Sequence, residues 1–146
     1  MKLFLLGILT MILFVSAPVS KPITGNWKTI DDETGKAKSI VYLFMKTDGK
    51  LYGRIIKLSK EPNEDQDPIC DKCTDARKDK KIIGMEIVKA LKKDGNTWYA
   101  DDGILDPHNG KVYDCKMWLD EKDPNKLNVR GYISFIYRTQ TWHRME

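Results

Sequence analysis

Residues 92–119, KKDGNTWYADDGILDPHNGKVYDCKMWL, decide the expected fold, because two turn signals separate short runs of strand-forming residues. Asp94-Gly95 and Asn109-Gly110 stand 15 residues apart. Asp-Gly and Asn-Gly between apolar runs are the strongest short-range signals of a β-hairpin. The segment therefore predicts consecutive antiparallel strands joined by tight turns.

The same spacing recurs towards the N-terminus, where Thr34-Gly35 and Asp48-Gly49 stand 14 residues apart. Short runs between such signals are typical of an all-β sandwich or barrel. The runs expected to form strands are 26–30, 39–46, 51–58, 87–92, 97–100, 103–105, 111–119, 127–132 and 137–145. Because closure removes exposed sheet edges, we expect a closed, mainly antiparallel β-barrel of about eight or nine strands.

Two segments depart from this pattern. Residues 81–93 hold apolar side chains at helical spacing, so a helix is an alternative there. We favour a short helical turn near 84–86 followed by a strand, because residues 92–99 have the pattern of a hairpin. Residues 59–80 hold two prolines and seven acidic residues and are expected to form one long loop. Loops longer than about 12–15 residues are typically functional or mobile.

The composition indicates one exported domain. The chain has 146 residues, of which 41% are hydrophobic and 32% charged, and its net charge is +4. Residues 1–20 hold one charge, Lys2, and an apolar run at 3–15 followed by small residues. That run is shorter than the ~20 residues of a membrane span and is typical of a signal peptide, with an uncleaved anchor as the alternative. We expect a signal peptide at 1–20, a single domain at 21–146 without a stable membrane span, and a periplasmic or secreted location.

The three cysteines are informative because disulfides persist in oxidising compartments. Cys70 and Cys73 form a C-x-x-C in the long loop, whereas Cys115 stands alone in an expected strand. We favour a Cys70–Cys73 disulfide with Cys115 as a free thiol facing the interior. Metal binding, redox chemistry, reduced thiols and other pairings remain alternatives, although zinc would need further ligands and only Cys115, His108 and His143 are available.

Seven blocks of sequence, taken in order, resemble a family of uncharacterised bacterial exported proteins, domain of unknown function 2147 (DUF2147). They are GNWKTIDD (25–32), DGKLYG (48–53), CDKC (70–73), IGM (83–85), ILDPHNGKVY (104–113), VRGY (129–132) and RTQTWHR (138–144). The opening Gly25-Asn26-Trp27 also resembles the Gly-x-Trp of the calycin superfamily. The resemblance covers 25–144 and implies a small exported lipocalin-like barrel, but it brings no activity.

The calycin resemblance also implies a structural contact at one end of the barrel. In calycins the opening tryptophan packs against an arginine of the last strand, which here would be Arg144 or, as the second choice, Arg138. A guanidinium over an indole contributes about 0.5–2 kcal/mol, so this contact would close the barrel with Trp27. The alternative is an arginine that binds the carboxylate of a substrate.

Strand alternation suggests what faces the interior. In 111–119, Tyr113, Cys115 and Met117 share one apolar face. Both faces of 39–46 are apolar, so this strand is covered on both sides or offers an outer patch to a partner. An eight-stranded barrel can be filled by side chains or can hold one small ligand, and both outcomes stay open. If a ligand is held, the expected lining residues are Tyr42, Phe44, Tyr113 and Met117, with Arg130 as a polar anchor.

Known catalytic motifs are missing from the sequence, and His108 and His143 have no evident nucleophile partner. The carboxylates near Asn109 fit no EF-hand loop, and the basic stretch 77–81 is interrupted by Asp79, so neither calcium nor nucleic acid is expected. We expect no metal and no cofactor. The leading hypothesis is an exported, non-enzymatic protein that binds a small apolar or amphipathic ligand. The alternative is a cell-envelope interaction module with a filled core, and a metal-assisted or lipid-modifying enzyme is a third class.

Overall fold

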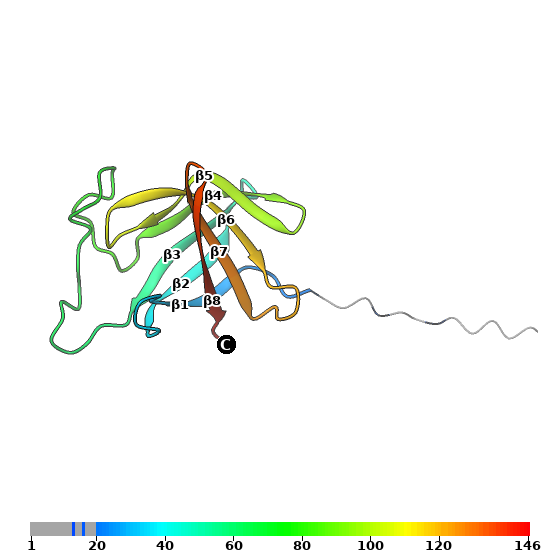
Figure 1. Ribbon diagram of the computed structural model, residues 1–146, viewed down its shortest axis with the longest axis horizontal. Coiled ribbons are helices and arrows are strands. Elements are labelled where there is room, and N and C mark those ends of the chain that lie inside the picture. The colour runs from blue at the N-terminus through cyan, green and yellow to red at the C-terminus, as the bar shows by residue number, and fades with distance from the viewer. Residues whose placement is uncertain (1–12, 14–15, 17–19) are drawn as a thin grey trace, which may run out of the picture.

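The computed structural model describes residues 13, 16 and 20–146, so the expected signal peptide lies almost wholly outside the described residues. The described chain forms one closed barrel in which every strand is antiparallel to its neighbours (Figure 1). Its strands are β1 (Gly25–Ile30), β2 (Ala37–Met45), β3 (Leu51–Leu58), β4 (Glu86–Asp94), β5 (Thr97–Asp106), β6 (Lys111–Leu119), β7 (Lys126–Ile133) and β8 (Ile136–Arg144). This confirms the predicted all-β barrel. Within the described ranges, no helix is long and apolar enough to span a membrane.

Eight strands form rather than nine, because the expected runs 97–100 and 103–105 are one strand, β5. Its pairing with β6 shifts register between Ala100 and Ile104, and Asp102 adopts a positive φ of 49°. β4 has a matching irregularity at Ala90, whose φ is 57°. Such bulges bend a strand without ending it. The gap expected between the runs 97–100 and 103–105 is therefore a bulge within one continuous strand.

The helix considered for residues 81–93, and the short helical turn near 84–86, do not form. Residues 82–84 make a bend and a turn, and β4 begins at Glu86. Main-chain hydrogen bonds to β3 explain this outcome: Gly84 N donates to Ile55 O at 2.7 Å, and Ile55 N donates to Met85 O at 3.0 Å. Sheet pairing has thus overridden a local preference for helix.

The closed end of the barrel is filled by Trp27 and Arg144, as the calycin resemblance implies. Trp27 is fully buried, and its Nε1 donates to the carbonyl of Ile23 at 2.8 Å. The Arg144 guanidinium lies 4.3 Å from the indole centroid and donates to the carbonyls of Pro22 at 2.8 Å and Pro124 at 3.1 Å. Burial lowers the pKa of Arg144. These contacts join β1 to β8, which pair in register at only two positions, Trp27 with Arg144 and Lys28 with His143.

Candidate ligand-binding site

A cavity of about 260 Å³ lies at the other end of the barrel. Its wall comes from the ends of β1, β3, β5 and β7 and the starts of β2, β4, β6 and β8, which antiparallel order brings to one rim. The apolar lining consists of Ile55, Leu58, Ile87, Ile104, Leu105, Val129 and Trp142, together with Pro107 at the rim. This volume lies just below the ~300–1,000 Å³ typical of small-molecule pockets.

One side of the rim is charged. Arg138 and Gln140 line the cavity, and both hold Asp32: Arg138 forms an ion pair with it, and Gln140 Nε2 donates to Asp32 Oδ2 at 2.7 Å. Lys38 also lines the cavity, and it takes part in none of the ion pairs among the described residues. Hydrogen bonds within the β1–β2 turn lower the pKa of Asp31, and the charge of Lys38 contributes to this shift. The Asp106 carboxylate also lines the cavity, so the rim carries charges of both signs.

The opposite side of the rim is the β5–β6 turn. Asn109 Nδ2 donates to the Tyr113 hydroxyl at 2.9 Å, and Asn109 Oδ1 accepts from Lys111 N at 2.8 Å. Asp106 Oδ1 accepts from His108 N at 2.9 Å. Side-chain bonds to the backbone two residues on are what Asx turns provide. The turn is thus held in one shape, with Pro107 and Asn109 facing the cavity.

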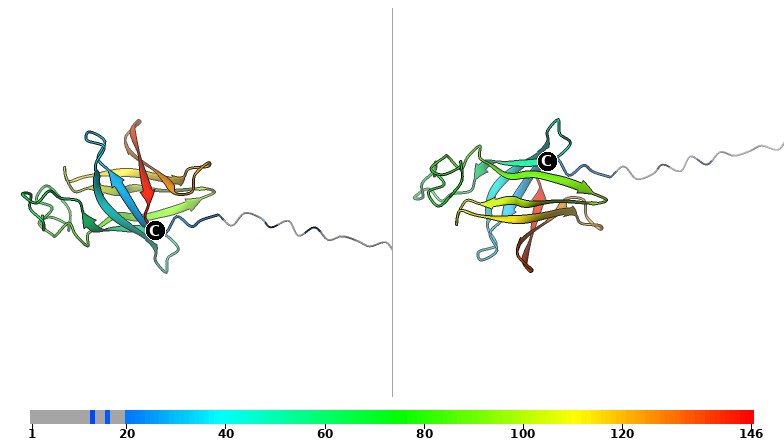
Figure 2. Two further views of the ribbon diagram at one scale, coloured as in Figure 1. Left: turned by 90° about the horizontal axis from the view of Figure 1, so that it is seen from below. Right: turned by 90° about the horizontal axis from the view of Figure 1, so that it is seen from above.

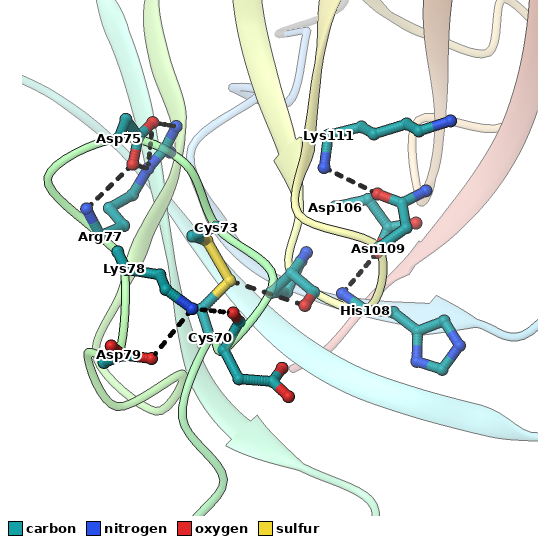
Figure 3. Close-up of a disulfide and its surroundings, with 12 residues drawn as sticks. Cys70, Cys73, Asp75, Arg77, Lys78, Asp79, Asp106, His108, Asn109 and Lys111 are labelled. Atoms are coloured by element: carbon teal, nitrogen blue, oxygen red, sulfur yellow. Dashed lines mark hydrogen bonds and ion pairs between the residues drawn. A yellow bond between two sulfur atoms is a disulfide. The ribbon is translucent and has the colours of Figure 1, made fainter.

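The long loop supports this turn from outside (Figure 3). Cys70 and Cys73 form a disulfide, as predicted, and the Cys70 Sγ lies 3.6 Å from the carbonyl oxygen of Pro107. A Cβ placed on Gly110 would overlap the main chain of Lys72, and the φ of Gly110 is +73°. The loop backbone therefore touches the turn so closely that only glycine fits there.

A second contact fastens the loop to β4. Arg77 Nη1 donates to the carbonyl of Glu86 at 3.0 Å, and Arg77 Nη2 pairs with Asp75 at 2.6 Å. The hydrogen bonds from Arg77 lower the pKa of Asp75 to about 2. No residue of 59–86 lines the cavity. The loop therefore packs against the β5–β6 turn and β4 beside the mouth of the cavity and does not cover the mouth.

The structure places the five expected lining residues in different environments. Tyr113 lines the cavity, and Met117 is fully buried below it in the filled core. Tyr42 and Phe44 lie on the outer face of β2, where their rings stack at 5.5 Å and Tyr42 is 38% exposed. Arg130 is also outside, with its Nε donating to Thr139 at 2.7 Å.

The prediction that Tyr42 and Phe44 face the interior is therefore wrong. Both faces of β2 are apolar, and the face that turns inward is the other one. Val41 and Leu43 are the fully buried positions. The aromatic face is stabilised outside the barrel by the Arg54 guanidinium, which lies 4.6 Å from the Phe44 ring. A guanidinium stacked on an aromatic ring shields that ring from water and allows it to lie on the outer face. The alternation of apolar residues along one strand does not show that such a cation is present. Arg130, stacked on outer aromatics in the same way, cannot anchor a ligand in the cavity.

Several cavity residues were missed from the sequence. Arg138, Gln140 and Trp142 alternate along β8 and share its inward face, a period-two pattern that could have identified them. Lys38 and the pair Thr29 and Ser39, whose hydroxyls lie 2.7 Å apart, gave no comparable signal.

A second hollow, of about 700 Å³, differs in kind. Its wall is made mainly of charged side chains from the β2–β3 turn, the long loop, β4 and β5, including Lys50, Asp75, Arg77, Lys89, Lys92, Asp101 and Asp102. Its uncharged residues are Thr74, Ala90, Tyr99, Ala100 and Val112. With charges of both signs along its wall it resembles an open surface depression rather than a ligand site. Among the described residues, no group of three or more histidine, cysteine, aspartate or glutamate side chains is placed to hold a metal ion.

Comparison with known proteins gives a family and a fold. The model of the family described as "Uncharacterized protein conserved in bacteria (DUF2147)" matches residues 25–144. No curated protein matches. Among solved structures, protein HP1028 from the human pathogen Helicobacter pylori, described as belonging to the lipocalin family, is similar with a TM-score of 0.68. The two chains are 17% identical, and the alignment covers 86% of this chain and 84% of that one.

Proposed function

Because this chain belongs to the DUF2147 family, whose description names no activity, we propose its function from the site: it is an exported, non-enzymatic protein that binds a small amphipathic molecule in the open end of its barrel. The observation that carries the proposal is the cavity of about 260 Å³, which has an apolar floor and a polar rim that includes Lys38, Arg138 and Asp106. Small-molecule sites combine such a lining with a few placed polar groups.

The orientation of the ligand follows from the lining. Its apolar part lies against Ile104, Val129 and Trp142, and its polar end meets Lys38 and the Tyr113 hydroxyl at the mouth. Arg138 is paired with Asp32, whereas Lys38 forms no ion pair among the described residues and is the cation proposed to meet an anionic group. Export is supported by residues 1–20 and by the disulfide, because disulfides persist outside the reducing cytoplasm.

Titration calorimetry with octanoate, octanol and octylamine tests the site. Octanoate should bind best, and Lys38→Ala should weaken octanoate about tenfold while leaving octanol unchanged. Gly131→Leu should abolish binding of all three, because Gly131 lines the cavity and a Cβ there meets only the Tyr113 side chain, at 3.5 Å. Thr141→Leu, on the exposed face of β8, is the matched control and should bind normally. Absence of binding by all three probes, or binding that survives Gly131→Leu, would overturn the proposal.

A further inference from the structure

The tip of the β7–β8 hairpin is the most exposed apolar part of residues 20–146. Within that range, the four most exposed large apolar side chains are Ile133, Phe135, Ile136 and Tyr137, at 55%, 87%, 68% and 56%. They lie within five consecutive residues. Figure 2 shows this orange and red hairpin projecting beyond its neighbours. Large apolar side chains gathered in this way mark an interaction site.

The apolar surface surrounds the hairpin on both sides. Ile133 and Ile136 are paired in register and share one face, whereas Tyr132 and Tyr137 share the other, with ring centroids 5.7 Å apart. Phe135 stands at the tip. A flat protein partner would cover one face only, but a layer of lipid chains surrounds an inserted ribbon completely.

The residues of the β7–β8 turn are not those that would make the turn most stable. Ser134 holds a positive φ of 56° in the two-residue turn, a conformation that glycine adopts without strain. Phe135 follows it almost fully exposed to water. A strained turn that presents a phenylalanine to solvent is consistent with a tip that acts by contact.

Behind the tip lies a belt of aromatic and cationic side chains. The Arg130 guanidinium stacks on Tyr137 at 4.2 Å and on Trp118 at 5.0 Å, and Lys116 Nζ lies 5.7 Å from the Trp118 ring. Arg130 forms no ion pair among the described residues. Residues 126–144 contain no aspartate or glutamate. The neighbouring carboxylates are Asp32, which pairs with Arg138, and Asp114, which lies opposite Tyr132 on β6. Arg130 and Lys116 are therefore the cations that the belt offers to an anionic surface.

We propose that the β7–β8 hairpin docks the protein on a membrane that carries anionic phospholipids. Phe135, Ile133 and Ile136 enter the acyl boundary, Tyr132 and Tyr137 lie at the interface, and Arg130 meets the lipid phosphates. Tyrosine and tryptophan favour this interface, and basic residues beside it bind anionic headgroups. From Tyr137 to the tip the hairpin spans two to three residues, or roughly 7–10 Å, which matches the ~5–10 Å reached by interfacial segments. This docking does not depend on whether the cavity holds a ligand.

Co-sedimentation with vesicles of phosphatidylglycerol and phosphatidylethanolamine tests the docking, with pure phosphatidylcholine vesicles for comparison. The protein should bind the anionic vesicles at least tenfold more tightly. Phe135→Asp should reduce that binding at least tenfold, and Arg130→Gln should reduce it several-fold and weaken its salt dependence. Ile56→Asp is the matched control, since Ile56 is an exposed apolar residue of β3 at 43%, and it should bind as the unchanged protein does.

A second measurement locates the tip. Because the chain has four native tryptophans, Trp118 of the belt among them, the comparison is between variants. A Phe135→Trp variant should lose more fluorescence in vesicles whose acyl chains are brominated than the unchanged protein does, and a Tyr42→Trp variant on another outer face should not. The proposal is overturned if the anionic vesicles do not bind the protein, if Phe135→Asp binds unchanged, or if Ile56→Asp loses as much. It is also overturned if the protein sediments as a dimer that Phe135→Asp separates while vesicles remain unbound, since the hairpin would then be a self-association surface.

Discussion

The two ends of the barrel use arginines of the same strand in opposite ways. Arg144 is packed over Trp27 and donates to main-chain carbonyls, so its charge strengthens a filled core. Arg138, six residues earlier on the same face of β8, has a side chain that is 67% exposed and pairs with Asp32 beside an open cavity. The neighbours explain the difference: a fully buried tryptophan fills one end, whereas Gly131, Thr29 and Ser39 leave space at the other. β8 thus contributes Arg144 to the filled end of the barrel and Arg138 to the edge of the cavity.

The largest loss of stability is expected from a substitution that removes the buried side chain at the closed end. Trp27→Ala removes a fully buried indole and leaves Arg144 without its aromatic partner. We expect the free energy of unfolding to fall by about 3–5 kcal/mol, measured by urea denaturation followed by circular dichroism. A loss below about 1 kcal/mol would show that Trp27 does not hold the barrel closed.

The next effect tests how tightly the loop supports the open end. Gly110→Ala adds a Cβ against the main chain of Lys72 at a positive φ and should cost about 3 kcal/mol. Gly49→Ala is its control, because Gly49 has a φ of +74° but no atom within 4 Å of the added Cβ, and it should cost only about 1 kcal/mol. Equal losses would mean that backbone strain alone is measured and that the loop gives no support.

Removal of the disulfide should have a somewhat smaller effect. The double variant Cys70→Ser, Cys73→Ser opens a four-residue ring and should lower the free energy of unfolding by about 2 kcal/mol. It should also weaken octanoate binding, because the β5–β6 turn loses its support. The affinity of the variant, measured by calorimetry below its unfolding transition, decides this: an unchanged value would separate the loop from the site.

Thiol labelling checks the cysteines of the unchanged protein. Burial raises the pKa of Cys115, which keeps its thiol protonated and unreactive. Iodoacetamide at pH 8.5 should therefore label nothing in the native protein and one cysteine after denaturation without reduction. Mass spectrometry of the peptides should place that label on Cys115, and a label on Cys70 or Cys73 would contradict the pairing.

The smallest stability effect is expected at the open end itself. Arg138→Met removes an exposed ion pair and should change the free energy of unfolding by less than about 1 kcal/mol. Arg144→Met, at the closed end, removes a partly buried guanidinium with three hydrogen-bond acceptors and should cost clearly more. Equal losses for the two variants, in the same urea experiment, would remove the contrast between the ends.

How much the sequence predicted depends on whether a signal is local. Turn dipeptides and Gly25-Asn26-Trp27 predicted the barrel, and the short Cys70–Cys73 spacing predicted the disulfide, because each depends on neighbouring residues. The face of β2 that turns inward depends on the whole barrel and on cations such as Arg54 from the next strand. With both faces apolar, alternation could not choose between Tyr42 and Val41. The bulges at Ala90 and Asp102 were hidden for the same reason, since they exist only in relation to partner strands.

The short seam between β1 and β8 also has a consequence for folding order. Every other strand pair joins consecutive strands, whereas Trp27 and Arg144 are 117 residues apart in the chain and belong to a seam of two paired positions. Contacts at long sequence separation form slowly because the chain entropy is lost before the contact is gained. The barrel should therefore assemble as a curled, open sheet and close at this seam last. In native-state hydrogen exchange the seam should be the first part to open, so the amides of Lys28 and Met145 should exchange before those of β6. Met145 N donates to Asn26 O across the seam at 2.9 Å.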